Sequence, residues 1–286
     1  MNPYQSYVSE LARVVRDGHR LPLGGFARPQ HPAVAEGAPS ALIFSPHPDD
    51  EVIIGGLPLR LLRELRWSVI NVAVTQGSRR ERQGERWTEL QQCCEYIGFQ
   101  LVQTVAGGLE GVNLGTRESK PAQWAGSVRR IRDILVAHAP QVIFFPHHDD
   151  WNVTHIGTHQ LVMDALQAMD QTFTCFTAET EFWGAMATPN LLVESGEADL
   201  ADLITALSFH AGEVRRNPYH LLLPAWMMDN VRRGGELVGG QGEAAPEFLF
   251  GTLYRLRRWR DGQFSEALPR GKFVSKNDDV AGLFKN

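Results

Sequence analysis

Short apolar runs alternate with helical hydrophobic patterns up to residue 182, and this alternation limits the folds that the chain can adopt. The runs expected to form strands are 41–45, 68–75, 100–105, 141–145 and one within 172–182. Helices are expected near 4–16, 56–65, 83–96, 122–137 and 154–169. Strands that alternate with helices build βαβ units with right-handed crossovers, which place the strands in a parallel sheet. The sequence therefore predicts an α/β, Rossmann-like three-layer sandwich with a mostly parallel sheet.

The remainder of the chain is less regular. Helical patterns cover 200–215 and 217–234, and 247–259 reads as a strand, with a helix as the alternative. We expect an N-terminal helix and loop over 1–40, an α/β core over 41–185 and a C-terminal extension over 186–286. The extension should pack on the core, cap the site and help to shape a ligand cleft, so that the whole chain forms a single domain.

Composition argues against several classes of partner. The net charge of -5 and the lack of a long basic tract make nucleic acid an unlikely ligand. No apolar run reaches the 18 residues of a membrane span, and the N-terminus lacks a signal-peptide pattern. The three cysteines form no CxxC pattern, and Cys93 and Cys94 fit buried free thiols, as expected for a cytoplasmic protein. Homo-oligomerisation stays open.

A dense polar motif, Pro46-His47-Pro48-Asp49-Asp50-Glu51, follows the expected strand 41–45. Three carboxylates so close together raise one another's pKa, which is a cost to the folded chain. A divalent cation would reverse that cost. Asp49 and Asp50 could then divide the chemistry, with one carboxylate as a metal ligand and the other as a base.

A second cluster, residues 146–155, follows the expected strand 141–145 and contains His147, His148, Asp149, Asp150 and His155. In a doubly wound sheet of order 3-2-1-4-5, the first and fourth strands are neighbours, and ligands bind at their carboxyl ends. This order, if present, brings the two clusters together.

Two histidines and one carboxylate with an open coordination position form a catalytic zinc site. His47, Asp50 and His155 could supply that set. His155 and His159 also lie four residues apart on a helix, as in zincins, but no glutamate follows His155.

The motif from Pro46 to Glu51, with a later histidine after the fourth strand, resembles the LmbE/PIG-L family of zinc-dependent N-deacetylases. The resemblance covers roughly residues 40–170 and includes Thr75-Gln76-Gly77 and Arg86-Trp87-Thr88-Glu89. It implies removal of an acetyl group from an N-acetylglucosamine-type amino sugar or glycoconjugate, with a metal-bound water as nucleophile. One Zn²⁺ per chain is implied, and Fe²⁺ or Co²⁺ could replace it.

Carried over by position, the resemblance implies His47, Asp50 and His155 as zinc ligands and Asp49 as the general base. The family's His-x-Asp-His motif reads Asn152-Val153-Thr154-His155 here, so the ligand is kept while two other positions differ. The amide of Asn152 can donate to an oxyanion but cannot give up a proton. Asp49, His147, His148 or His210 would then have to supply the proton. Gln76 also replaces an acidic residue of the family pattern.

Substrate contacts are expected from Arg86, His148 and Asn190. Arg86 could bind a sugar hydroxyl or a phosphate, or could instead pair with Glu89 on the helix surface. Asn190 ends the segment 181–190, which, like 217–220, is expected at the rim of the cleft.

Two alternatives to the deacetylase remain open. The departures at Asn152 and Thr154 would suit a sugar-binding homologue with impaired catalysis. A phosphoester hydrolase is the other alternative, because Asp149 and Asp150 could bridge a second metal ion.

Overall fold

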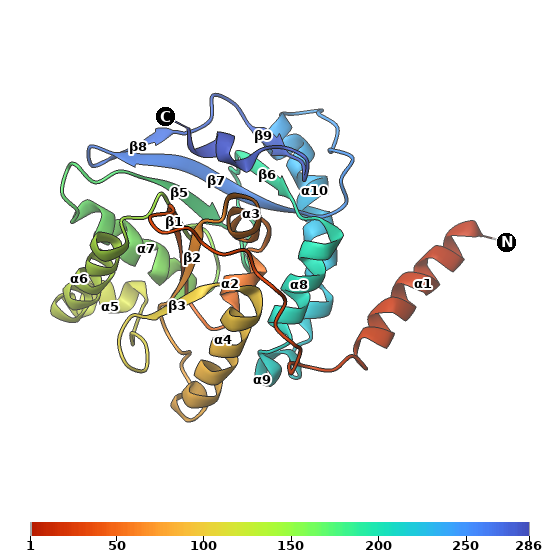
Figure 1. Cartoon of the computed structure of the whole chain (residues 1–286), viewed down its shortest axis with the longest axis horizontal. Helices are drawn as coiled ribbons and strands as arrows, with labels where there is room; N and C mark the ends of the chain where they lie inside the picture. The colour runs from red at the N-terminus through yellow and green to blue at the C-terminus, as the bar shows by residue number, and fades with distance from the viewer. Residues whose placement is uncertain (1, 286) are drawn as a thin grey trace.

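A single mixed sheet runs through the molecule, with helices on both faces (Figure 1). The computed structural model describes residues 2–285. Five parallel strands form one half of the sheet in the order β3-β2-β1-β4-β5. These strands are β1 (Ser40–Ser45), β2 (Ser68–Ala73), β3 (Gln100–Gln103), β4 (Val142–Pro146) and β5 (Cys175–Thr180). The predicted order 3-2-1-4-5 is therefore confirmed.

Alternate residues of the strands feed two hydrophobic cores. Leu42 and Phe44 of β1 face the layer of α6 and α7, whereas Ala41 and Ile43 face the opposite layer. The helices of this parallel half are α2 (Asp50–Ile53), α3 (Gly56–Leu65), α4 (Gln83–Ile97), α5 (Leu114–Ser119), α6 (Pro121–His138) and α7 (Val153–Gln167). The expected three-layer α/β sandwich is confirmed.

The C-terminal third extends the sheet, and its expected role as a cap of the site stays a prediction. Strand β7 (Gly251–Arg260) pairs antiparallel with β5, and β6 and β9 continue the sheet beyond it, while β8 pairs with β7. The added strands are β6 (Leu191–Glu194), β8 (Gln263–Glu266) and β9 (Lys272–Val274). These strands are too short to show a periodic pattern in the sequence.

The helical patterns of this third are shorter or later than expected. The pattern over 200–215 divides into α8 (Glu197–Leu207) and α9 (Ala211–Val214). Helix α10 (Leu223–Gly239) begins after the 217–222 segment, with a proline in its first turn. The stretch 208–222 therefore holds only the short α9 and a 3-10 turn, and its His210 and Tyr219 contact the turn after β1.

Helix α1 (Pro3–Gly18) stands apart from the body of the molecule (Figure 1). Its residues are all at least partly exposed, including Tyr4, Tyr7 and Leu11. Across residues 2–285 no helix is long and apolar enough to cross a membrane. Cys93, Cys94 and Cys175 are buried free thiols, as expected for the first two; the cytoplasmic location and the oligomeric state stay predictions.

Candidate active site

Three side chains meet at the carboxyl ends of β1 and β4. His47 Nδ1 lies 3.2 Å from His155 Nε2, although 108 residues separate the two histidines. Asp50 Oδ2 lies 3.3 Å from His47 Nδ1 and 3.4 Å from His155 Nε2. The structure thus brings together the three residues that the sequence suggested as metal ligands, at the predicted switch point of the sheet.

The spacing of these three atoms fits a divalent cation. A tetrahedral ion with ligands at about 2.0–2.1 Å separates its ligand atoms by about 3.3–3.4 Å. The side chains of Asp50 and His155 are 2% and 0% exposed, whereas that of His47 is 19% exposed. Two ligand positions are therefore enclosed, and the third borders the solvent-accessible side.

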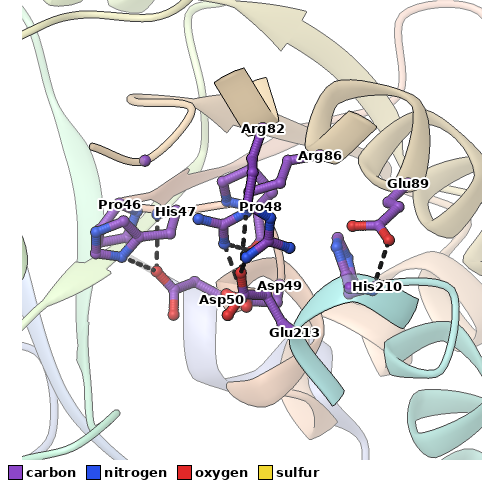
Figure 2. Close-up of polar contacts among 12 residues, drawn as sticks. Pro46, His47, Pro48, Asp49, Asp50, Arg82, Arg86, Glu89, His210 and Glu213 are labelled. Carbon is purple, nitrogen blue, oxygen red and sulfur yellow. Dashed lines mark hydrogen bonds and ion pairs between the residues drawn. The ribbon is translucent and has the colours of Figure 1, made fainter. Parts of the chain in front are cut away.

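A strained turn separates the roles of Asp49 and Asp50. Asp49 has φ 113°, a conformation that a residue with a side chain rarely adopts. The backbone N–H of Asp49 donates to Glu51 Oε2 at 2.9 Å, and that of His47 donates to Asp50 Oδ2 at 2.8 Å. As a result Asp50 lies beside His47, while Asp49 lies beside Arg86 (Figure 2).

Asp150 lies beside the second histidine of the three residues. Its Oδ2 lies 3.4 Å from His155 Nδ1, on the side of the ring away from Asp50. The backbone N–H groups of Asn152, Trp183 and Gly184 donate to the same carboxylate. Burial raises the pKa of Asp150, but His155 and the N–H groups of Asn152 and Gly184 outweigh burial and keep that pKa below its usual range. A carboxylate in this position fixes the tautomer of a metal-binding histidine.

The side chain of Asp49 is 13% exposed, and two donors hold its carboxylate. Tyr219 Oη donates to Asp49 Oδ2 at 2.6 Å, and Arg86 Nη2 lies 3.4 Å from the same oxygen. Burial and the nearby Asp50 raise the pKa of Asp49 to about 6, against the opposing effects of Arg86, His210 and Tyr219. A carboxyl group with a pKa this close to neutrality can both accept and return a proton.

Two histidines considered as proton donors are engaged elsewhere. His210 Nε2 lies 2.7 Å from Glu51 Oε1, and Cys93 Sγ donates to that oxygen at 3.0 Å. Burial opposes the charge on His210, but Glu51 outweighs it and raises the pKa of the imidazole. His147 Nε2 lies 2.8 Å from the carbonyl of Gly184. Both imidazoles support the turns around the site.

Asn152 is the N-cap of α7. Its Oδ1 accepts a hydrogen bond from Thr154 N at 2.9 Å, which fixes the first turn of the helix that carries His155. The cap uses only the oxygen of the amide, and Asn152 also lines the main cleft.

The three expected substrate contacts lie in different environments. Arg86 does not pair with Glu89 but donates to the carbonyl of Pro48 at 2.7 Å, so the surface-pair alternative is wrong. His148 is exposed and lies 3.1 Å from Asp149 Oδ2.

Asn190 makes no hydrogen bond to His47, Asp50 or His155, here called the ligand triangle. Its Nδ2 donates to Leu256 O at 2.8 Å, and its Oδ1 accepts from Leu256 N at 2.7 Å. Both polar atoms of the Asn190 amide are therefore used to hold the backbone of β7, and neither is free to contact a substrate.

A cleft of about 580 Å³ opens beside His47 and Asn152. Its size suits a small-molecule ligand. The loop 109–113 forms part of its wall, and the sequence carried no motif there. The segments expected at the rim contribute Phe182, Trp183 and Tyr219 to a separate apolar pocket of about 300 Å³.

The family model described as PIG-L: GlcNAc-PI de-N-acetylase, an amide hydrolase, matches residues 42–166. This segment contains most of β1, the whole of β4, and His47, Asp50 and His155. This part of the chain is similar to the PIG-L family, as the motif from Pro46 to Glu51 suggested.

Solved structures show the same fold at low sequence identity. N,N'-diacetylchitobiose deacetylase from Pyrococcus horikoshii has a TM-score of 0.53 at 16% identity, covering 90% of this chain and 93% of that protein. The zinc-inhibited form of teicoplanin deacetylase Orf2 has a TM-score of 0.57 at 15% identity, covering 77% and 98%.

GalB, the 4-carboxy-2-hydroxymuconate hydratase from Pseudomonas putida KT2440, has a TM-score of 0.56 at 13% identity, covering 76% and 95%. No curated protein is a significant sequence relative of this chain. Because a hydratase and deacetylases share the fold, the fold alone does not decide the reaction.

Proposed function

We propose that this protein is a zinc-dependent hydrolase that removes the acetyl group from an N-acetylated amino sugar of the N-acetylglucosamine type. One observation carries the proposal: His47 Nδ1, Asp50 Oδ2 and His155 Nε2 form a triangle that could hold a metal ion. The neighbouring carboxylate of Asp49 is not part of this triangle and is therefore left to act as a base. The deacetylase description of the matched family supports the same reaction.

His47, Asp50 and His155 would hold the cation. A zinc ion in such a set lowers the pKa of a water molecule to about 7 and polarises a carbonyl group. Asp150 would keep the imidazole of His155 in the orientation that this binding needs, because its carboxylate faces Nδ1.

Asp49 would move the proton. Its carboxylate takes a proton from the attacking water, and the pKa of about 6 then lets the carboxyl group pass that proton to the departing amine. The amide nitrogen of Asn152, which the helix cap leaves unused, would donate to the oxyanion of the tetrahedral intermediate. The cleft beside His47 would hold the sugar.

The direct test measures acetate released from N-acetylglucosamine and N,N'-diacetylchitobiose, with zinc, iron or cobalt supplied in turn. Elemental analysis of the same protein should find about one metal ion per chain, and His47→Ala and Asp50→Ala should lose it. His138→Ala is a matched control, because His138 lies beside the amino end of β1, at the opposite end of this strand from the triangle.

Two results would contradict the proposal. Full metal occupancy in both ligand variants would remove His47 and Asp50 from the site. A fully loaded protein that releases no acetate from any N-acetylated amino sugar would remove the deacetylase function.

A further inference from the structure

Helix α1 carries an apolar stripe that its own chain leaves uncovered. At 3.6 residues per turn, the large apolar residues of the helix and its last glycine fall within an arc of about 120°. These residues, here called the α1 stripe, are Tyr4, Tyr7, Val8, Leu11, Val14, Val15 and Gly18. None of them is buried, and Tyr4 is 72% exposed. Because a helix of this length is only marginally stable in water without packing, the α1 stripe calls for a partner.

The charged residues of α1 lie on the opposite face of the helix. Arg13 donates to Glu10 at 2.7 Å and lies 3.2 Å from Asp17, so that these residues form a ladder of alternating charge. With Arg16 the helix holds equal numbers of acidic and basic residues, and it contains no lysine, tryptophan or phenylalanine. Helices that lie on membranes are rich in basic residues and in such aromatic anchors. The composition of α1 therefore favours a protein surface as its partner.

The α1 stripe is symmetric about Leu11. Each residue of the stripe before Leu11 has a counterpart equally far after it along the chain. The pairs are Tyr4 with Gly18, Tyr7 with Val15, and Val8 with Val14. When two such helices run antiparallel around a two-fold axis at Leu11, each residue faces its counterpart on the other helix. The tyrosines then meet the smaller Gly18 and Val15, as close packing of a seam requires.

The position of α1 on the molecule suits an antiparallel pair. The helix stands apart from the body, and its amino end points away from it (Figure 1). Its last turn adjoins the body, because a Cβ at Gly18 would lie 2.9 Å from Leu221 Cδ2. Antiparallel helices place the two bodies at opposite ends of a pair about 24 Å long, whereas parallel helices would bring both bodies to the same end. Leu21 is exposed next to Gly18 and would extend the contact with Tyr4 of the second copy.

We propose that α1 pairs with α1 of a second copy of this chain, antiparallel and centred on Leu11, and that the protein is thereby a dimer. The α1 stripe is the surface, and its occupant is the same stripe of the other copy. This inference does not depend on the proposed reaction, because no residue of α1 lines the main cleft.

Sedimentation velocity of the full chain over a range of concentrations tests the assembly. The unmodified protein should sediment with the mass of two chains. Leu11→Glu/Val14→Glu places carboxylates from both copies in the seam and should raise the Kd of the dimer about a hundredfold or more. Gln5→Glu/Ser9→Glu adds the same charge to exposed positions on the other face of α1 and should stay dimeric. A monomeric unmodified protein, or a dimer that Leu11→Glu/Val14→Glu leaves intact, would overturn the proposal.

Disulfide cross-linking tests the direction and register of the pair. Leu11→Cys places the two new thiols at the two-fold axis, so mild oxidation should link most of the chains. Tyr4→Cys places them about 21 Å apart at a rise of 1.5 Å per residue, so this variant should stay unlinked. The three native cysteines are buried and should not compete. Efficient linking in both variants would indicate parallel helices, and linking in neither would indicate another dimer surface; each result overturns the proposal.

Vesicles of phosphatidylcholine and phosphatidylserine test a membrane as the alternative partner. The dimer covers the α1 stripe, so the unmodified protein should not sediment with the vesicles. Circular dichroism checks that Leu11→Glu/Val14→Glu keeps its folded body, which is expected because both positions are exposed. Vesicle binding by the unmodified protein that this variant abolishes would assign the α1 stripe to a lipid surface and overturn the proposal.

Discussion

Tyr219 donates a 2.6 Å hydrogen bond to Asp49 Oδ2 across 170 residues of sequence. The bond joins the 3-10 turn Tyr219–Leu221, which follows α9, to the strained turn after β1. Burial and the nearby Asp50 raise the pKa of the Asp49 carboxylate, whereas the hydrogen bond from Tyr219 favours its charged form. The C-terminal third therefore contributes directly to the chemistry of the turn, through a residue that belongs to no motif.

Removal of this hydrogen bond should shift the pH dependence of turnover. Asp49 is active as a base only when ionised, so activity falls as the pH drops through its pKa of about 6. Tyr219→Phe removes a group that lowers this pKa, so the acid limb of kcat/KM should move to higher pH by about one unit or less. Tyr96→Phe, which loses a hydrogen bond to Asp202, is the matched control. An unmoved acid limb in Tyr219→Phe would separate Tyr219 from the titration of Asp49.

Asp49→Asn should separate catalysis from metal binding. The side chain lies beside the ligand triangle and is not a member of it, so the variant should keep about one metal ion per chain. Loss of the base should reduce kcat by about 10²–10⁴-fold. Elemental analysis and acetate release measured on one preparation check both halves. Turnover near that of the unmodified protein would remove Asp49 from the mechanism.

Asp150→Ala should weaken metal binding although Asp150 is not a ligand. Its carboxylate orients His155 through Nδ1, and loss of such a partner typically lowers metal affinity about 10–100-fold. Competition with a chelator measures the Kd for zinc. Asp149→Ala is the control, because that neighbouring carboxylate is exposed and pairs with His148. Equal Kd values in the two variants would show that Asp150 does not support the site.

The ligand triangle could be predicted because its members are tied to strand ends. His47 and Asp50 follow β1 directly, His155 lies in the first turn of the helix after β4, and parallel strands align their carboxyl ends. The turn from 46 to 51 carries a recognisable pattern, so the sequence supplied both the residues and their meeting place.

Contacts between irregular segments could not be predicted in this way. Tyr219 contacts Asp49 from a segment without hydrophobic periodicity. The sequence could not show that Asp150 lies beside Nδ1 of His155, because that contact depends on the fold of the loop between β4 and α7. Strands β6 and β9 are too short to show a pattern. The pairing of β6 with β7 and of β9 with β6 depends on long-range contacts. Asn190, which the sequence suggested as a substrate contact, lies at the start of this part of the sheet.

Substitution of Asn190 should affect stability before it affects binding. Asn190→Ala leaves the buried N–H and C=O groups of Leu256 without their side-chain hydrogen bonds. The loss should lower the free energy of unfolding by about 1–3 kcal/mol. Denaturant unfolding measures this change, and the KM for the substrate should stay the same in the folded variant. A higher KM at unchanged stability would restore the substrate-binding role that the sequence suggested.

Asn152 carries two roles that two substitutions can separate. Asn152→Ala removes the cap of α7 and should cost about 0.5–2 kcal/mol in the free energy of unfolding. Asn152→Asp keeps the capping oxygen but replaces the amide donor with a negative charge, so stability should be retained while kcat falls by about 10²–10³-fold. Unfolding curves and kcat measured on both variants give the comparison. A fully active Asn152→Asp protein would rule out the oxyanion role and leave the cap of the helix that carries His155 as the sole function of this side chain.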